Sequence, residues 1–571
     1  MPLMVKSKLK TSNAALPRNL GLFGCFLAFS TFPAFAQQAS DLADIQLQRQ
    51  QQREEAQRRQ DDATPDVRLQ APAPAEHAGY PENETPCFVI RLVKLEGDAA
   101  ADFQWALAAA DPVLGRCLGS TGVNTLVGEV QNALIERGYV TSRILAAPQD
   151  LRSGELRLKM VPGRIRAIRF AGVAPRGGHA SALPARSGDI LNLRAIEQGL
   201  ENFKRVPGAQ GDIQIIPGEQ PGESDLLIKW AAGRGYRISF SADDSGTEST
   251  GAYQGGITLS LDNPIGLYDL FYATLNRNLP GDSTSGAHGT KGYALHYSIP
   301  YGYWLASLQV NDYRYHQTVA GASQDYVYSG TSTNTELKLA RLVYRDAVRK
   351  TTLSLRGYQR RSRNFIDDTE VEVQRRQMGG FAAGLHHKEF IASSTLDAAL
   401  SWKVGTSDFG TLPAPEEAYG EGTSRPRLFN ADVTLSIPLG PSFALQSAWR
   451  AQWNRTPLVP QDRFAIGGRY TVRGFDGEAS LSSERGWLVR NDLSWNLSGT
   501  SQQVYAALDH GVVSGPASAG LVGKRLTGAA LGWRGQLGRL QADVFAGAPL
   551  RKPSAFHTAK VTAGFNLNFE Y

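Results

Sequence analysis

The chain has 571 residues, of which 20% are charged, and this composition excludes a disordered protein and a helical membrane protein. Its net charge of +6 is small for the length, and no basic stripe with interleaved aromatic residues favours nucleic-acid binding. A membrane β-barrel is compatible with this composition, because polar residues that face its lumen alternate with apolar residues that face lipid.

Residues 1–36 have the pattern of a secretory signal peptide. A basic start is followed by an apolar stretch that ends in Ala34-Phe35-Ala36, a small-residue cleavage site. The apolar stretch is short for a transmembrane helix. We therefore expect an exported protein whose mature chain begins at Gln37.

Residues 37–62 are rich in Gln, Arg and Glu and predict a helix that is polar on all sides. Such a helix is either solvated or held in a polar environment such as a water-filled lumen, and the residues alone leave both interpretations open. Residues 63–84 contain Pro-rich, extended sequence and predict a linker.

Residues 85–163 and 164–232 predict two successive βαβ-like modules. The helix of the first module is expected over 124–139, where apolar residues recur at helical spacing and Gly138 marks the C-terminal stop. The strands expected around it are 88–95, 140–145 and 155–161. In the second module we expect strands at 165–170, 213–216 and 225–230 and a helix at 193–204.

Cys87 and Cys117 are the two cysteines that remain once the predicted signal is removed. An even number of cysteines in an oxidising compartment predicts a disulfide, and closing a loop of this size stabilises a fold by a few kcal/mol. A metal site or a reactive thiol is the alternative, but no His or second Cys stands at ligand spacing near either residue.

Residues 233–571 show a period-2 pattern that differs from the modules before it. Near its end, apolar residues from Val561 to Tyr571 alternate with polar ones. Segments of about ten residues separated by turn residues are typical of a transmembrane barrel, and this length accommodates roughly 16 strands. A soluble β-sandwich alternates likewise, but the secretory signal and the length of the run favour the membrane. Phe569 and Tyr571 are predicted to form a membrane-insertion signal.

No persuasive catalytic constellation, metal-ligand cluster or nucleotide-binding loop is recognisable in the sequence. We therefore expect neither an enzyme nor a cofactor or metal.

The segment 466–478 is unusual for a barrel, because it places Arg473 between glycine-rich stretches. If a long loop carries Arg473 into the lumen, the buried guanidinium needs an acid, since an unpaired charge in a crowded interior is costly. Asp509, on a later alternating strand, is the candidate partner.

Val472-Arg473-Gly474-Phe475 resembles the VRG(Y/F) motif of the BamA/TpsB superfamily, and Asp509 matches the inward acid that the arginine engages there. Other segments resemble two POTRA modules; they are 86–90, 115–119, 135–143, 162–165, 191–202 and 205–208. The match spans nearly the whole mature chain. The chain is thus similar to the two-partner secretion transporters (TpsB) of the haemolysin-activator ShlB, filamentous-haemagglutinin-transporter FhaC and CdiB type.

The resemblance implies a mainly β fold: a 16-stranded transmembrane β-barrel (233–571) preceded by two POTRA domains (85–163 and 164–232) and a plug helix (37–62). It implies location in the outer membrane, with the POTRA domains in the periplasm. An unfolded exoprotein (haemolysin, adhesin or contact-dependent inhibition toxin) would bind the POTRA domains and cross the barrel without ATP. The other expected partners are the barrel assembly machinery and outer-membrane lipid. The alternatives are a BamA-like assembly factor and a passive porin.

Overall fold

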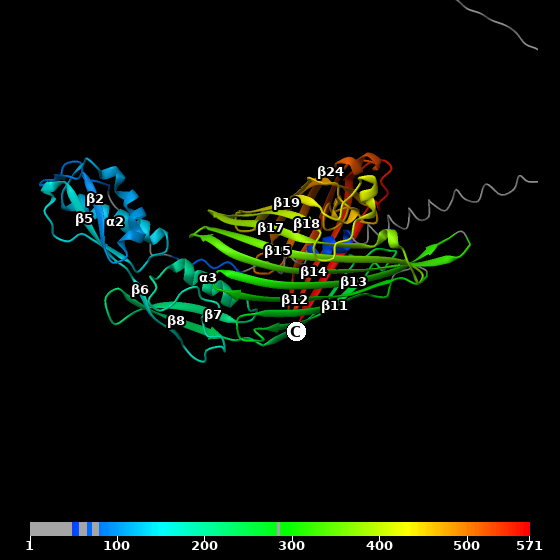
Figure 1. Ribbon diagram of the computed structural model, residues 1–571, viewed down its shortest axis with the longest axis horizontal. Helices are drawn as coiled ribbons and strands as arrows, with labels where there is room; N and C mark the ends of the chain where they lie inside the picture. The colour runs from blue at the N-terminus through cyan, green and yellow to red at the C-terminus, as the bar shows by residue number, and fades with distance from the viewer. Residues whose placement is uncertain (1–47, 56–64, 71–78, 282–285, 322) are drawn as a thin grey trace, which may run out of the picture.

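Two α/β modules stand at one end of a closed β-barrel (Figure 1). The computed structural model describes residues 48–55, 65–70, 79–281, 286–321 and 323–571. The predicted signal peptide, both ends of the predicted plug helix (37–47 and 56–62) and residues 63–64 and 71–78 of the predicted linker lie outside the described residues. We call the barrel end that contacts the modules the module end, and the opposite one the loop end.

The first module is a three-stranded sheet in the order β2-β5-β4, with β2 parallel and β4 antiparallel to β5. A separate pair, β1 and β3, flanks it. Its elements are β1 (Phe88–Val89), β2 (Leu92–Gly97), η1 (Ala100–Val113), β3 (Cys117–Leu118), α2 (Ser120–Glu136), β4 (Arg143–Leu145), η2 (Leu151–Ser153) and β5 (Glu155–Val161).

The predicted single strand over 88–95 is wrong, because the chain changes hydrogen-bonding partners in the middle of it. The Ile90 N–H donates to the carbonyl of Arg116 at 2.9 Å, whereas the Arg91 N–H donates to that of Gly154 at 2.7 Å. Two short strands in different sheets result. The strand predicted from residue 140 also begins later, at Arg143.

Helix α2 begins at Ser120, four residues before the predicted start. Its N-terminus is capped by a residue that is distant in sequence: the Glu84 carboxylate accepts the N–H groups of Gly119, Thr121 and Gly122 at 2.5–3.0 Å. This capping satisfies donors that the first turn of a helix leaves free. The local sequence contains no such signal.

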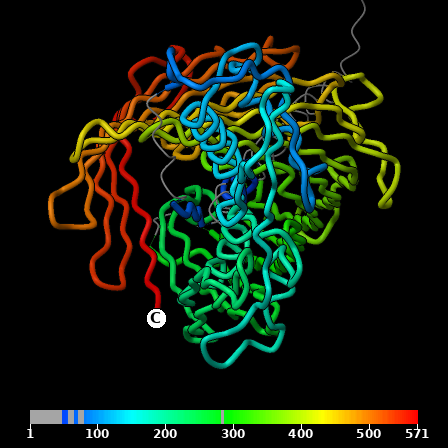
Figure 2. Tube along the Cα trace, turned by 90° about the vertical axis from the view of Figure 1, so that its left-hand side faces the viewer, coloured from blue at the N-terminus to red at the C-terminus, as the bar shows by residue number. Residues whose placement is uncertain are grey.

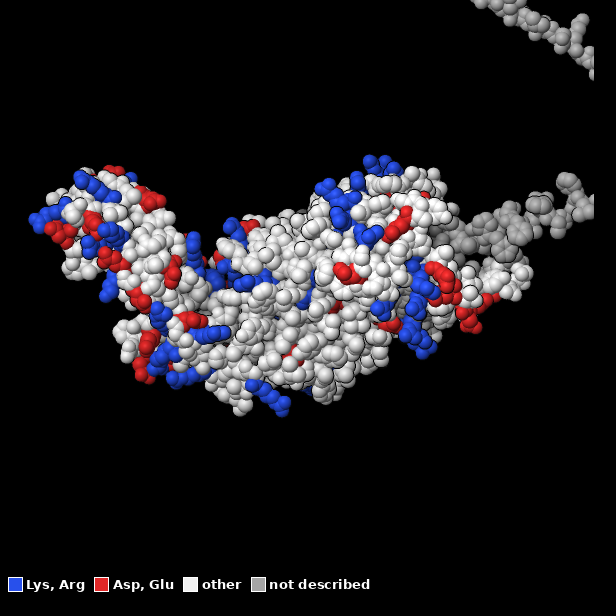
Figure 3. Space-filling view, in the orientation of Figure 1, with Lys and Arg blue, Asp and Glu red and all other residues white. Residues whose placement is uncertain are grey.

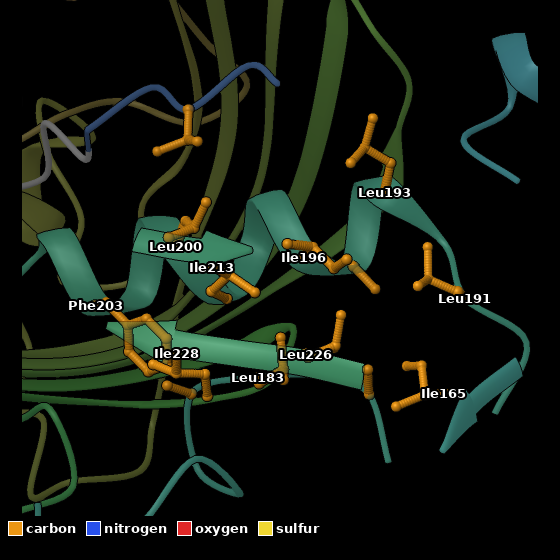
Figure 4. Close-up of a cluster of buried hydrophobic side chains, with 14 of the residues drawn as sticks. Ile165, Leu183, Leu191, Leu193, Ile196, Leu200, Phe203, Ile213, Leu226 and Ile228 are labelled. Atoms are coloured by element: carbon orange, nitrogen blue, oxygen red, sulfur yellow. The ribbon is translucent and has the colours of Figure 1, made fainter. Parts of the chain in front are cut away.

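The second module repeats this topology, in the order β6-β8-β7 with α3 packed on the sheet. Its elements are β6 (Arg164–Phe170), α3 (Leu193–Lys204), β7 (Gln210–Pro217) and β8 (Glu223–Ala231). Figure 4 shows Ile196 and Leu200 of α3 on the side of the helix near Leu226 and Ile228 of β8, and all four are buried. Each such side chain contributes about 1.5–3 kcal/mol by leaving water.

Sixteen strands close the barrel within the described residues, as the sequence length predicted. They are β9 (Tyr236–Asp243), β10 (Gln254–Asp262), β11 (Leu270–Asn278), β12 (Gly289–Tyr301), β13 (Trp304–Ala320), β14 (Asp325–Arg345), β15 (Arg349–Ile366), β17 (Arg376–Ile391), β18 (Ser394–Thr406), β19 (Arg427–Leu439), β20 (Phe443–Asn454), β23 (Arg485–Asn496), β24 (Gln503–Ser514), β25 (Arg525–Leu537), β26 (Leu540–Arg551) and β27 (Thr562–Glu570). A two-residue strand, β16 (Thr369–Glu370), pairs with the end of β15, and β27 pairs with β9 to close the ring.

Large apolar side chains lie exposed on the outside of the barrel. Leu275, Leu337 and Leu531 are each more than 60% exposed. Figure 3 shows that Lys, Arg, Asp and Glu are sparse over the middle of the barrel and gather toward its ends and on the modules. An apolar belt of this kind is what lipid tails require. Among the described helices, none is long and apolar enough to cross a membrane.

The second module docks on the turns at the module end of the barrel. Tyr268, in the β10–β11 turn, is fully buried against Phe203 and Trp230, with ring centroids 4.7 Å and 5.1 Å apart. Its hydroxyl donates to the carbonyl of Gly178 at 2.7 Å. A single aromatic side chain of the barrel is thereby part of the core of the second module.

A segment that we call the strap, residues 65–70, crosses between α3 and the barrel. Val67 is buried and Leu69 half-buried, whereas the alternate residues are exposed. The N–H groups of Val67 and Leu69 donate to the carboxylates of Glu201 and Glu197, each at 2.9 Å. In Figure 4 a blue segment passes α3 on the side away from β8. Module, strap and barrel therefore share one interface.

Arg345, at the end of β14, ties this interface together. Its guanidinium donates to the carbonyl of Val67 at 2.5 Å and lies 3.1 Å from Glu197 and 2.9 Å from Glu201. Its side chain is only 4% exposed, so these acids compensate a buried charge.

Candidate functional site

The candidate site is built by the long loop between β20 and β23, residues 455–484, which folds back into the barrel. A short hairpin of β21 (Phe464–Ile466) and β22 (Leu481–Ser483) forms its stem. The tip holds the sequence-predicted motif, and all four of its residues are buried: Val472, Arg473, Gly474 and Phe475. The loop tip is therefore packed against the wall and not extended into solvent.

The Arg473 guanidinium meets two carboxylates of the barrel wall. Its Nε and Nη2 donate to the two oxygens of Asp509, both at 2.7 Å, and its backbone N–H donates to the same carboxylate at 2.9 Å. Nη2 also donates to Asp492. Arg473 is 5% exposed and Asp509 is 0% exposed, so this forked pair is shielded from water.

Strand alternation explains why Asp509 points inward. On β24 the preceding residue, Leu508, is exposed on the outside, so Asp509 faces the lumen. Two further arginines lie near these acids: Arg534 Nη1 is 3.5 Å from Asp492, and Arg490 Nε is 3.8 Å from Asp509. The cluster thus contains two carboxylates and three guanidinium groups, and each carboxylate lies near two of the arginines.

Glycines let the loop backbone approach the wall. Gly474 has a φ of +91°, and a Cβ there would lie 2.5 Å from the carbonyl oxygen of Ala548. On the wall side, a Cβ at Gly528 would lie 2.0 Å from the carbonyl oxygen of Arg473. Both positions exclude a side chain, which is why glycine occurs on each side of the contact.

An apolar cluster surrounds the charged centre. Val472 and Phe475 of the loop pack with Ile466 of its stem and with Leu526 and Phe556 from the neighbouring wall and loop. The Phe475 and Phe556 rings meet edge to face at 5.8 Å. This cluster keeps water away from the Arg473 pairs and strengthens their attraction.

Residues 48–55 form a helix inside the barrel (Figures 1 and 2). Its contacts reach both the loop and the wall. Gln48 donates to Ser482 of the loop stem at 2.9 Å, and Arg49 lies 3.5 Å from Glu478 beyond the tip. Arg53 pairs with Asp243 at the end of β9, at 2.9 Å. The polar helix is therefore held in a polar lumen, the second of the two environments that the sequence left open.

Arg469 links the same loop to the place where the barrel closes. Its guanidinium pairs with Asp244, just beyond β9, and donates to the carbonyl of Phe565 on β27 at 3.0 Å. The Phe565 N–H donates to the same Asp244 at 2.8 Å. Loop, first strand and last strand thus meet at one carboxylate.

The remaining predicted residues lie far from this loop. Cys87 and Cys117 form a disulfide in the first module, with their Cα atoms 5.3 Å apart. Phe569 and Tyr571 are both exposed at the module end of the last strand, where the ring of Tyr571 has Arg539 5.1 Å from its centroid. Within the described residues, no group of three or more His, Cys, Asp or Glu could hold a metal ion.

Sequence reasoning did not find Asp492, Arg534, Gly528 or the Asp243–Asp244 pair. Asp492 could have been found by the same alternation that indicated Asp509, because it too sits inward on a wall strand. The others have no local signal, since each matters only through a loop that reaches it from elsewhere in the chain.

Comparison with known proteins decides the family. Residues 222–535, more than half of the chain, match the model described as haemolysin secretion/activation protein ShlB/FhaC/HecB. The chain belongs to this family. Within it, residues 88–163 match a ShlB-type POTRA domain and residues 164–217 match a POTRA domain. We call these modules POTRA 1 and POTRA 2, although the finer boundaries that the sequence suggested stay predictions.

Named relatives and solved structures agree with this family assignment. The outer membrane transporter CdiB-2 of Burkholderia pseudomallei (strain 1026b) is 35% identical, over 95% of this chain and 98% of its own length. CdiB from Acinetobacter baumannii is 30% identical with a TM-score of 0.80, covering 93% of this chain and 98% of that one. CdiB from Escherichia coli is 26% identical, also with a TM-score of 0.80, covering 93% and 99%.

This member of the ShlB/FhaC/HecB family is an outer-membrane transporter of the two-partner secretion type, with its POTRA modules in the periplasm. The predicted family, fold class and location are confirmed. The module end of the barrel is thus periplasmic, and the loop end is extracellular. The assembly factor and the porin are not favoured.

Proposed function

We propose that this transporter exports one large unfolded exoprotein of the contact-dependent inhibition toxin class. The degree of similarity supports this choice among the three classes that the sequence left open. CdiB-2 of Burkholderia pseudomallei is 35% identical over 95% of the chain, whereas the haemolysin transporters HpmB and ShlB are 25% and 26% identical over 72% and 69%. An open reading frame for a large toxin beside this gene is the expected finding, and a haemolysin or adhesin there would contradict it.

The client enters from the periplasm, where the POTRA modules offer it strand edges. In the described residues β7 pairs on one side alone, with β8, so its other edge is available for an extended segment. No nucleotide site is recognisable in the sequence, and the periplasm holds no ATP. Export therefore draws on the free energy that the client gains by folding outside the cell.

The observation that carries the mechanism is the forked pair of Arg473 with Asp509. We assign to this pair the role of holding the inner loop in the position that permits transport, with the helix of residues 48–55 as the plug of the resting pore. The Gln48 and Arg49 contacts support a coupling between the two, since loop and plug share a hydrogen bond and an ion pair. A purely structural role, in which the pair only stiffens the barrel, is the competing explanation.

Substitution of Arg473 separates these explanations. Arg473→Ala removes the guanidinium that forms the forked hydrogen bonds with buried Asp509, and removing one partner of a buried pair costs about 3–5 kcal/mol. We expect barrel insertion to stay largely intact, measured as heat-modifiable migration of the purified full chain, while export of the co-expressed exoprotein is lost. Arg463→Ala in the same loop is the matched control, because among the described residues its guanidinium forms no ion pair and donates to a backbone carbonyl, that of Leu458, at 3.3 Å.

Full export by Arg473→Ala would refute the assigned role. Loss of the inserted barrel together with export would favour the stiffening explanation instead. Arg473→Lys adds a graded test, since it keeps the charge and removes the two-pronged geometry.

Insertion of the barrel depends on its last strand. We infer that the barrel assembly machinery reads Phe569 and Tyr571, and their exposure at the end of β27 supports this role.

A further inference from the structure

Five arginines line the extracellular rim of the barrel over one sector of its wall. We call them the arginine row: Arg427, Arg455, Arg485, Arg525 and Arg551. They stand at the extracellular ends of β19, β20, β23, β25 and β26, and all five are exposed. Figure 3 shows Lys and Arg side chains gathered at the barrel end near β24, opposite to the POTRA modules.

The row follows an aromatic girdle on the lipid-facing surface. Trp402, Phe429 and Trp453 stack across three neighbouring strands, with ring centroids 6.0 Å and 5.5 Å apart. Trp487, on the next strand, is 42% exposed. Aromatic side chains in such a girdle mark the level of the membrane–water interface.

The arginines lie one step beyond these rings and on the same face. Each arginine is two positions from an aromatic residue: Arg427 from Phe429, Arg455 from Trp453 and Arg485 from Trp487. Side chains two residues apart on a strand point to the same side of the sheet. Three guanidinium groups therefore project outward at the height of the lipid headgroups.

The other two arginines face outward for the same reason. The Thr527 hydroxyl lies 2.8 Å from His510, whose ring contacts the ring of outward-facing Trp487 at 5.5 Å between centroids. Arg551 is the register partner of Thr527, and Arg525 precedes Thr527 by two residues. The row thus spans six neighbouring strands of this sector, with an arginine at the end of each of them except β24.

The charge of the row is not compensated by the protein. Within the described residues none of the five arginines forms an ion pair, and Arg485 Nε donates to a neutral partner, the amide oxygen of Asn454, at 2.8 Å. Two arginines on the extracellular side of other strands do form ion pairs: Arg314 Nε lies 3.1 Å from Asp312, and Arg375 Nε lies 2.7 Å from Glu370. No acidic side chain of the described residues neutralises the row, so an anion from outside the chain would be its counter-charge.

We propose that the arginine row binds the phosphate groups of lipopolysaccharide in the outer leaflet. Guanidinium groups bind phosphate in a two-pronged manner, and neighbouring strands lie about 4.8 Å apart, so adjacent arginines can share one headgroup. The girdle beneath the row would contact the acyl chains of the same lipid. The row thereby fixes the depth of this sector of the barrel in the outer leaflet. The sector includes the strands that anchor the inner loop.

The test uses the purified full chain and lipid A as the probe. Native mass spectrometry measures binding of lipid A that carries both phosphates and of lipid A from which they have been removed. We expect the triple variant R455Q/R485Q/R525Q to bind phosphorylated lipid A at least tenfold more weakly than the unaltered chain. The matched control is R314Q/R361Q/R363Q, which removes the same charge from exposed positions on β13 and β15.

Equal binding by the two triple variants would overturn the proposal, as would binding by the unaltered chain that does not change when the phosphates are removed. The second comparison needs no variant, so misfolding of a triple variant cannot obscure the answer. Binding lost equally with both triple variants would indicate general charge attraction and would also refute a specific row. Because export is not the readout, the result is independent of the role proposed for Arg473.

Discussion

At the scale of single residues, the inner loop is held by one guanidinium that satisfies two carboxylates. Asp509 alone could neutralise Arg473, but a second acid, Asp492, also accepts a hydrogen bond from its Nη2. Arg534 and Arg490 lie within 4 Å of these two acids. Buried charges of this kind stabilise a unique position only when all of them are paired. A cluster with several members therefore specifies where the loop sits more strictly than one pair would.

The close approach of loop and wall at Gly528 can be tested directly. Gly528→Ala places a methyl group 2.0 Å from the Arg473 carbonyl oxygen, so the loop tip or the strand must move. Overpacking of this kind costs about 1–3 kcal/mol. We expect faster cleavage of the loop in limited proteolysis of the full chain, together with weaker export.

Gly520→Ala is the control for this substitution, because nothing lies within 4 Å of a Cβ built at Gly520. If the two variants are cleaved at the same rate, the steric explanation for Gly528 is wrong.

At the scale of elements, POTRA 1 depends on links between segments that are distant in sequence. The disulfide joins β3 to the residue before β1, and Glu84 caps α2 from outside the helix. The pKa of Glu84 is lowered: partial burial would raise it, but the N–H groups of Gly122, Thr121 and Gly119 outweigh that effect. The cap is therefore charged at neutral pH, as a helix N-terminus favours.

Removal of the disulfide is expected to destabilise POTRA 1 and leave the barrel intact. The two cysteines are 30 residues apart, and a loop of that size corresponds to about 3–4 kcal/mol of stabilisation. Pulse proteolysis of the full chain in urea measures this for C87S/C117S, with the reduced unaltered chain as the matching comparison. An unchanged urea midpoint for POTRA 1 would contradict the expectation.

At the scale of the whole molecule, the strap follows the plug helix in the chain and lies in the interface between POTRA 2 and the barrel. Asp66 pairs with Lys350 on β15 and Lys388 on β17. Burial by itself would raise the pKa of Asp66, but the two lysines outweigh this and hold it below its ordinary value. The strap is thus fixed by charge at Asp66 and by apolar burial at Val67.

Loosening the strap should alter the resting pore. V67S/L69S removes the two side chains that face α3, and burial of the first contributes about 1.5–3 kcal/mol. We expect more frequent open events of the full chain in planar lipid bilayers, because the segment that follows the plug helix is no longer held. Q70S, at an exposed strap position, is the control. Identical conductance of the two variants would show that the strap does not restrain the plug.

Much of this protein follows from the sequence by itself. Period-2 alternation behind a signal peptide predicted the barrel, because lipid and lumen impose opposite polarities on successive residues. Alternation also made Asp509 an inward candidate, and the need to compensate a buried charge linked it to Arg473. The even cysteine count predicted the disulfide that joins Cys87 and Cys117.

Other features were decided by the tertiary structure alone. The burial of Tyr268 in POTRA 2, the Glu84 cap and the contact of Gly528 with the loop each join segments that no local periodicity relates. They exist only once the barrel has closed, the loop has folded inward and the module has docked. The physical reason is that steric contact and charge pairing depend on distances in space, whereas a single sequence reports the polarity of each position and the spacing along the chain.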